Sequence, residues 1–273
     1  MQRMAKQCIV AMLRSLNTSA TGMVAQQFNL DVISNNLANV NTTGFKHQRA
    51  EFHDLVYQTV QAAGTSVGGN FKTPTGVQFG LGSMVSATAN DLSQGASTST
   101  GNSLDLMIIG EGYFRVLKPD GGFGYTRDGS FKKDATGLIV NSSGYPLVPQ
   151  ISIPEGATLI SIGQDGTVEA LLAGSATPTK IEQINLAMFA NAAGLTRAGE
   201  NIWVESAASG APNLVAGGTS GAGTISSGYL EGSNVSVVEE MVRMISAQRA
   251  YEINSKAIQT SDDMLQVLNT LKR

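Results

Sequence analysis

Two short motifs in this 273-residue chain match patterns of nucleophilic catalysis. Residues 64–68 read Gly-Thr-Ser-Val-Gly, the G-x-S-x-G pattern that presents a serine on a strand-to-helix turn and needs a histidine later in the chain. The only histidines, His47 and His53, precede Ser66, and the motif lies in a polar loop. Residues 130–133 (SFKK) match S-x-x-K, but S-D-N and K-T-G do not occur elsewhere. Neither motif predicts an enzyme, and we expect no catalytic residues.

Metal and phosphate binding have no better support. His47, Glu51, His53 and Asp54 form a small cluster, but its histidines do not have the i, i+4 spacing of a helical metal site. The glycine-rich segment 217–223 lacks the Lys-Ser/Thr of a phosphate-binding loop, so it is interpreted as a flexible connector. We therefore expect no metal and no cofactor.

Composition excludes further classes. Charged residues make up 14% of the chain, below the roughly 25% of an average soluble domain. A net charge of −3 excludes the basic footprint of a nucleic-acid binder. No apolar run reaches the ~18 residues of a membrane span, and a single cysteine, Cys8, excludes an internal disulfide. The first residues lack a full secretory signal, and Met12 is an alternative start that would make residues 1–11 an extension.

The two ends of the chain have helical periodicity. Apolar or small residues recur with heptad-like spacing at Leu13, Leu16, Ala20, Met23, Leu30 and Leu37. This pattern predicts a helix from about Met12 to Asn39, with Gly44 as a stop signal.

The C-terminal pattern is stronger. Ser233 or Asn234 is the expected cap, and Glu239 and Glu240 lie near the positive end of the helix dipole. The seam comprises Ala247, Ala250, Asn254, Ala257, Ser261, Met264, Leu268 and Leu271, widened by Tyr251, Ile258 and Leu265.

Between the ends the period shifts toward two, with turn signals between short strands. Strands are expected at 158–162, 167–172, 182–189 and 202–205, and low-order connectors at 62–75 and 207–227. The predicted fold is α+β: long N- and C-terminal helices pairing as a coiled coil, with an inserted, mostly antiparallel all-β domain. The predicted boundaries are 12–47 for the first helix, 48–95 for a connecting segment, 96–228 for the β domain and 229–273 for the last helix.

Four asparagines, at 35, 36, 39 and 41, interrupt the end of the first helix. Asparagine is a poor helix former because its amide competes for backbone hydrogen bonds. Two explanations remain open. The amides fix register against neighbouring chains, as a buried asparagine does in coiled coils, or they only fray the helix end into a loop.

Three separated segments resemble the family of flagellar rod and hook proteins. They are NLDVISNNLANVNTTGFK (29–46), GEGYFRVLKPDGGFGYTRDGSF (110–131) with GENIWVES (199–206), and EEMVRMISAQRAYEINSKAIQTSDDMLQVL (239–268). The segment 52–85 is typical of family members from the distal rod rather than the hook.

The resemblance implies a structural subunit of the distal rod that polymerises helically into a hollow drive shaft. The terminal helices would line the tube, and the β domain would face outward. Expected partners are further copies, neighbouring rod and hook subunits, the outer ring bushing and the flagellar type III export apparatus, in a rod that spans the periplasm. The alternatives are a proximal rod or hook subunit, or a secreted cell-wall-binding β-domain protein.

The expected assembly interface consists of apolar and amide side chains on the two terminal helices. Its residues are Leu13, Leu16, Ala20, Met23, Leu30, Asn35, Asn36, Leu37, Asn39, Asn41, Met241, Ala247, Tyr251, Asn254, Ile258, Met264, Leu265 and Leu268.

A subunit that must stay export-competent gains from helices that fold only on assembly, since new contacts then offset the ordering entropy. We expect residues 12–45 and 235–273 to be largely disordered in a dilute monomer. Hydrogen exchange of the purified chain tests this expectation, and strong protection of both segments would contradict it.

Overall fold

The computed structural model describes residues 2–64, 66–68, 71–72, 74–173 and 177–271. The chain divides into two units. The helical unit contains the chain up to Leu37, the segment Gln48–Ala89 and the chain from Val237 onward. The β body contains Ala38–His47 and Asn90–Ser236. The model is therefore mixed α+β, as predicted, with a helix at each end and a β-rich middle.

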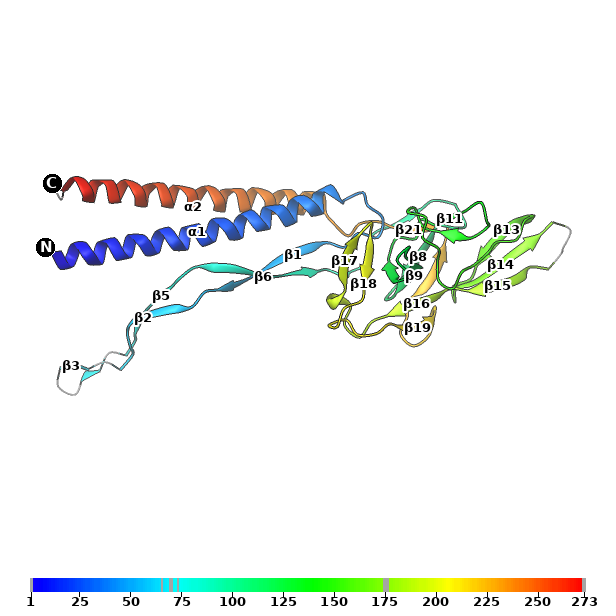
Figure 1. The fold of residues 1–273 in the computed structure, drawn as a ribbon, viewed down its shortest axis with the longest axis horizontal. Helices are drawn as coiled ribbons and strands as arrows, with labels where there is room; N and C mark the ends of the chain where they lie inside the picture. The colour runs from blue at the N-terminus through cyan, green and yellow to red at the C-terminus, as the bar shows by residue number, and fades with distance from the viewer. Residues whose placement is uncertain (1, 65, 69–70, 73, 174–176, 272–273) are drawn as a thin grey trace. The chain divides into compact units, whose positions relative to one another are not determined.

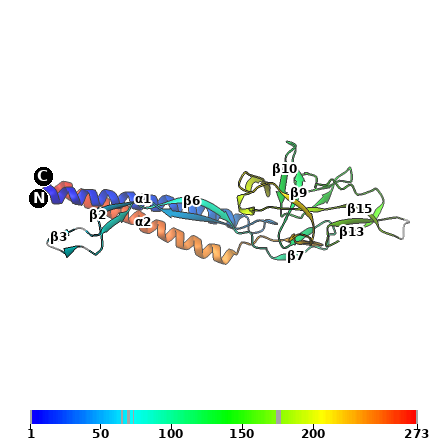
Figure 2. The ribbon, with the colours of Figure 1, turned by 90° about the horizontal axis from the view of Figure 1, so that it is seen from below.

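The helical unit is built on two long helices, α1 (Gln2–Ala38) and α2 (Val237–Leu271). They run antiparallel, so the start of α1 and the end of α2 lie at the same end of the pair (Figures 1 and 2). They meet at three levels. The hydroxyls of Ser15 and Ser261 lie 3.2 Å apart, and the Asn36 amide donates to Glu240 over 3.1 Å. A Cβ on Gly22 would lie 3.0 Å from the Asn254 amide. The residue numbers of all three pairs sum to 276, so the helices keep one register along their length.

The three contacts of α1 with α2 come from residues outside the predicted seam. Ser15, Gly22 and Asn36 share one side of the helix at spacings of seven and fourteen, whereas Leu13 is half exposed on another side. Glycine and serine let the two helices approach closely, and the larger leucines do not. Contact of the predicted leucine seam with α2 stays a prediction, whereas the predicted α2 seam does contact α1 through Asn254 and Ser261. Coiled-coil packing of the pair stays a prediction.

The segment predicted as a connector is an antiparallel hairpin. Strand β1 (Gln48–Asp54) lies beside β6 (Ser83–Asn90), and β2 (Tyr57–Gln61) pairs with β5 (Val77–Gly80). Strands β3 (Ser66–Gly68) and β4 (Phe71–Lys72) pair beyond them. The sequence leaves the order of residues 62–75 open; β3 and β4 form within this segment, and residues 65, 69–70 and 73 lie outside the described residues.

The hairpin packs directly on α1. Gly82 has φ +121°, and a Cβ there would lie 2.0 Å from the hydroxyl of Thr21, so only glycine fits this contact. Nearer the N-terminus, the Arg14 guanidinium lies 5.1 Å from the centre of the Phe79 ring. These contacts hold the ribbon against the helix, which an isolated two-stranded ribbon needs for stability.

The β body is antiparallel throughout its paired strands. Its largest sheet has the order β17-β18-β10-β9-β16-β19, beside a three-stranded sheet β13-β14-β15 and the pairs β8–β20, β7–β21 and β11–β12. The bounds are β7 Ser97–Ser99, β8 Leu106–Ile109, β9 Tyr113–Leu117, β10 Phe123–Thr126, β11 Lys132–Lys133, β12 Ile139–Val140, β13 Ala157–Ile162, β14 Thr167–Leu172, β15 Thr179–Gln183, β16 Asn185–Met188, β17 Thr196–Gly199, β18 Ile202–Val204, β19 Asn213–Ala216, β20 Thr224–Ser227 and β21 Tyr229–Glu231, with a 3-10 turn at Ala192–Gly194. Phe114, Phe131 and Leu186 are wholly buried in its core.

The predicted strands at 158–162, 167–172 and 202–205 are confirmed to within one residue, and 182–189 is the end of β15 followed by β16. The predicted connector at 207–227 is wrong, because β19 and β20 lie within it and pair with β16 and β8. Its glycines serve close packing: a Cβ on Gly223 would lie 2.4 Å from the carbonyl oxygen of Ile109. Alternation of apolar residues does not reveal such strands when glycine and serine dominate them.

The chain that leaves α1 belongs to the β body. The helix ends at Ala38, one residue before the predicted end at Asn39, and begins at Gln2 rather than at Met12. Gly44 has φ +67°, and Phe45 and Lys46 are almost wholly buried. The predicted domain boundary at residue 47 stays a prediction. The predicted cap at Asn234 is wrong: its side-chain oxygen accepts from the His47 amide, and α2 begins at Val237.

A network of buried charged side chains joins the segment that follows α1 to the rest of the β body. Lys46 Nζ lies 2.6 Å and Arg127 Nη1 3.3 Å from the two carboxylate oxygens of Glu231, which is 1% exposed. Lys46 also donates to the carbonyl of Ser93 over 2.7 Å. Burial lowers the pKa of Lys46, and the bond to Glu231 opposes that shift by favouring the charged form.

Replacing Glu231 by alanine leaves two buried cations without their carboxylate. Breaking a buried pair from one side costs about 3–5 kcal/mol, so E231A should lower the free energy of unfolding of the β body by that amount. Urea unfolding followed by fluorescence of Trp203, the single tryptophan, measures the loss. E155A, at an exposed glutamate, is the control and should change stability by less than about 0.5 kcal/mol. Equal stability of the two variants would contradict the role of the network.

Candidate assembly surface

The residues of the catalytic and metal-binding motifs considered above lie in different parts of the fold. Ser66 lies in β3 of the hairpin, and the Ser130 amide donates to Asp128 in a turn of the β body. His53 is exposed on β1. No group of three or more His, Cys, Asp or Glu side chains suited to a metal ion occurs among the described residues. Among the residues that the structure describes, no helix is both long enough and apolar enough to span a membrane.

Exposed apolar side chains are concentrated in the helical unit. Among the described residues, 25 large hydrophobic side chains are exposed, and only Ile109, Phe123, Leu159, Leu214 and Tyr229 belong to the β body. The other twenty lie on α1, α2 and the hairpin. A monomeric soluble protein rarely exposes so much apolar surface on one unit, so this distribution indicates an interaction surface.

The predicted assembly residues fall into distinct environments. Leu13, Ala20, Asn35, Asn41, Met241, Tyr251 and Met264 are exposed; Leu16, Met23, Leu30, Leu37, Asn39, Asn254, Ile258 and Leu265 are half-buried; Asn36 and Ala247 are buried. The side chain of Leu268 lies outside the described residues. Most of the set is thus available to another chain.

Asn36 departs from that expectation because its amide is used inside the chain. Its oxygen accepts from the Gln48 amide over 2.9 Å, and its nitrogen donates to the Gln48 carbonyl at 2.7 Å and to Glu240 at 3.1 Å. Asn36 and Glu240 are almost wholly buried, and Arg243 pairs with Glu240 over 3.3 Å. Asn36 therefore fixes the register of α1, β1 and α2 within one chain. Neither of the two open explanations describes this residue.

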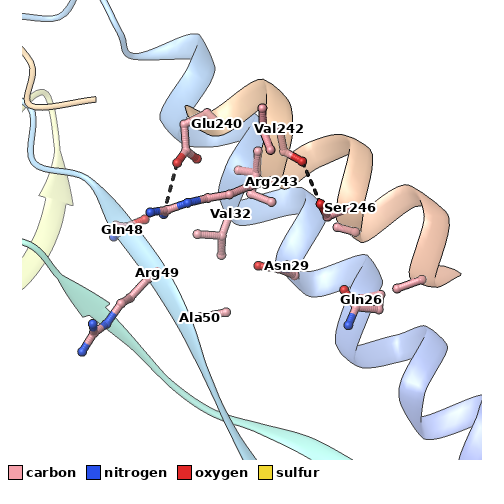
Figure 3. A pocket seen from close by; sticks show the side chains of 13 residues that line it. Gln26, Asn29, Val32, Gln48, Arg49, Ala50, Glu240, Val242, Arg243 and Ser246 are labelled. Atoms are coloured by element: carbon pink, nitrogen blue, oxygen red, sulfur yellow. Dashed lines mark hydrogen bonds and ion pairs between the residues drawn. The ribbon is translucent and has the colours of Figure 1, made fainter. Parts of the chain in front are cut away.

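A groove lies beside this contact, where α1, β1 and α2 meet. Gln26 and Asn29 extend into it from α1 and Ser246 from α2, and Arg243 crosses it to reach Glu240 (Figure 3). Its volume is about 350 Å³, and its wall mixes polar groups with Val32 and Val242.

A second groove of about 480 Å³ lies between α1 and the hairpin, and its wall is almost entirely apolar. Ala20, Val24 and Phe28 contribute from the helix, and Leu55 and Met84 contribute from the hairpin. Ala20 belongs to the predicted assembly surface, and the other four residues do not. Leu55 and Met84 were not predicted because their segment was interpreted as a connector.

The sequence analysis also missed the outer side of α2. Val238, Val242 and Ile245 are 55–72% exposed and follow one another at spacings of four and three. This is a second apolar stripe, opposite the seam that meets α1. The spacing of these residues predicts this stripe, but the predicted assembly set includes only the alanine-rich seam and its neighbours.

Comparison with protein families identifies three matching models. The model of the flagella basal body rod protein matches residues 16–46, and that of the flagellar hook protein FlgE/F/G D1 domain matches 107–170. The flagellar basal body rod FlgEFG protein C-terminal model matches 226–271. The matches follow the order of α1, the β body and α2.

Similarity to individual proteins extends over the whole chain. The flagellar basal-body rod protein FlgG of Buchnera aphidicola subsp. Schizaphis graminum is 49% identical over 260 residues, covering 95% of this chain and all of that protein. FlgG of Borreliella burgdorferi is 49% identical over 264 residues, covering 96% of this chain and all of that protein. The flagellar hook protein FlgE of Helicobacter mustelae is 46% identical over 136 residues, covering 49% of this chain and 30% of the hook protein.

Removing the Asn36 amide should loosen the contact of α1, β1 and α2. N36A removes the hydrogen bonds that Asn36 makes to both backbone groups of Gln48 and to the Glu240 carboxylate, which keeps its ion pair with Arg243; each lost buried bond costs about 1–3 kcal/mol. Amide hydrogen exchange of peptides around Gln48 and Glu240 should accelerate. N35A, at the exposed neighbour, is the control and should leave both peptides unchanged. Equal exchange in the two variants would contradict the assignment.

Proposed function

Because this chain belongs to the family of flagellar basal-body rod and hook proteins, we propose that it is a structural subunit of the distal rod. Copies of it stack helically into a hollow shaft that transmits torque from the motor to the hook. The observation that supports this proposal best is identity of 49% with rod proteins along their full length.

The distribution of apolar surface supports a polymer. The β body buries its own core, whereas the helical unit leaves large apolar side chains exposed on α1, α2, β1, β2, β5 and β6. At about 25 cal/mol per Å² of buried apolar area, covering these side chains with further subunits is a strong driving force for assembly. Packing against other copies would thus complete the helical unit.

The exposed members of the predicted interface are assigned to contacts between subunits. Leu13, Ala20, Met241, Tyr251 and Met264 are accessible on the helices, and Leu13 lies away from the side of α1 that meets α2. The half-buried Leu16, Met23 and Leu30 extend the same surface. Asn36 is excluded from this set because its bonds lie within its own chain.

The role is structural rather than enzymatic. The similar proteins are rod proteins, and the candidate nucleophiles and histidines do not form a site. Neighbouring rod and hook subunits and the outer ring bushing are the proposed partners. The proposed route is export through the flagellar type III apparatus to a rod that spans the periplasm, with no nucleic acid involved.

A hook subunit or a secreted wall-binding protein is less well supported. Similarity to the hook protein covers 49% of this chain, against 95% or more for the rod proteins. A proximal rod subunit differs in position only, and basal-body microscopy separates the two positions.

Electron microscopy of basal bodies from a strain lacking this gene tests the proposal. We expect a rod that stops short and carries neither ring bushing nor hook, with motility restored by the intact gene. A complete rod without a hook would instead indicate a hook subunit. A normal basal body in a motile strain would contradict an axial role.

A further inference from the structure

The apolar groove on α1 is held open by specific contacts. Gly82 lies against Thr21 at one end of the groove, and the amide of Leu55 donates to the carbonyl of Gly82 over 2.8 Å. Arg14 stacks on Phe79 further along the same ribbon. The hairpin therefore forms a fixed wall opposite Val24, and binding of another chain does not lose conformational entropy in ordering this wall.

The outer side of α2 has the shape and chemistry to enter such a groove. Val238, Val242 and Ile245 occupy positions i, i+4 and i+7, the anchor pattern of an amphipathic helix that docks in an apolar groove. Ile253 and Val267, 66% and 58% exposed, extend the stripe toward the C-terminus. Val238 and Ile245 lie on the side of α2 opposite Asn254 and Ser261, which contact α1 of the same chain. Val242 lies between them and also borders the groove where α1, β1 and α2 meet.

Charged side chains of opposite sign lie beside the two surfaces. Asp31 lies three residues beyond Phe28 on the same side of α1 and is exposed. On α2, Lys256 lies on the exposed side with Ile245 and Ile253, and Arg249 on that side pairs with Glu252 of its own helix over 3.7 Å. Complementary charges of this kind set the orientation of two surfaces and disfavour wrong pairings.

We propose that the groove between α1 and the hairpin receives the outer side of α2 from a second copy of this chain. This inference rests on the proposed function and specifies which surfaces of the subunit meet. In this contact Asp31, beside the groove on α1, is paired with Lys256 of the incoming helix.

The geometry of this contact favours growth. The groove and the α2 stripe are different surfaces of one unit, so the contact is heterologous, and each copy still offers one free groove and one free stripe. Heterologous contacts generate rings if the rotation closes and open helical filaments if it does not. Repetition of this one contact is sufficient to extend a row of subunits.

Cross-linking between two single-cysteine chains in assembled basal bodies tests the proposal. Cys8 is the only cysteine, so C8S provides the background. V24C in the groove and I245C on the stripe are co-expressed from separate genes, and purified basal bodies are treated with a short bismaleimide. Each chain carries one thiol, so a covalent dimer forms only between copies. We expect the dimer from the co-expressed pair and none from either variant alone.

The matched control pairs V24C with L159C, an equally exposed site on the β body, and should give no dimer. M84C with V238C is a second groove-and-stripe pair, used if V24C or I245C fails to assemble. Both chains present in basal bodies without a dimer, or V24C cross-linking to itself, would overturn the docking proposal and leave the rod function standing. Absence of the intact protein from basal bodies would overturn the proposed function itself.

Discussion

The buried amide of Asn36 is the contact on which the helical unit depends. It bonds both backbone groups of Gln48 and the carboxylate of Glu240, so one side chain ties α1 to β1 and to α2. A buried amide of this kind tolerates few alternatives, because a shift of one residue would leave several polar groups without partners. The constant register of the helix pair, with Ser15 opposite Ser261 and Gly22 opposite Asn254, follows from it.

That register has a consequence for stability. The contact between the helices uses serine, glycine and asparagine, which fix alignment but bury little apolar area. Leu13, Val24 and Phe28 of α1 and Val238, Ile245 and Ile253 of α2 remain exposed. The unit is thus well specified in geometry and weakly stabilised in isolation, which suits a subunit that completes its packing only in a polymer.

The β body, in contrast, buries its apolar core within the chain. Its core of Phe114, Phe131, Leu186 and their neighbours is closed within one chain, and the ion network of Lys46, Arg127 and Glu231 holds the entering and leaving strands together. Buried charges add little net stability, but removing one partner is costly. Charge thereby fixes where the segment that follows α1 lies within the β body, while apolar burial stabilises the body around it.

The sequence by itself determined the two terminal helices, the antiparallel β middle and the rod family, because periodicity and the quoted segments are local properties of the chain. The strand at 167–172 and the end of α1 at Ala38 were predicted to within a residue. Only the tertiary structure decided which side of α1 meets α2, since a stripe of leucines does not reveal whether it packs within the chain or between chains. The same holds for Asn36, whose partner Glu240 lies 204 residues away. It holds also for the hairpin and for β19 and β20, where glycine and serine conceal the strands and the partner strand supplies the order.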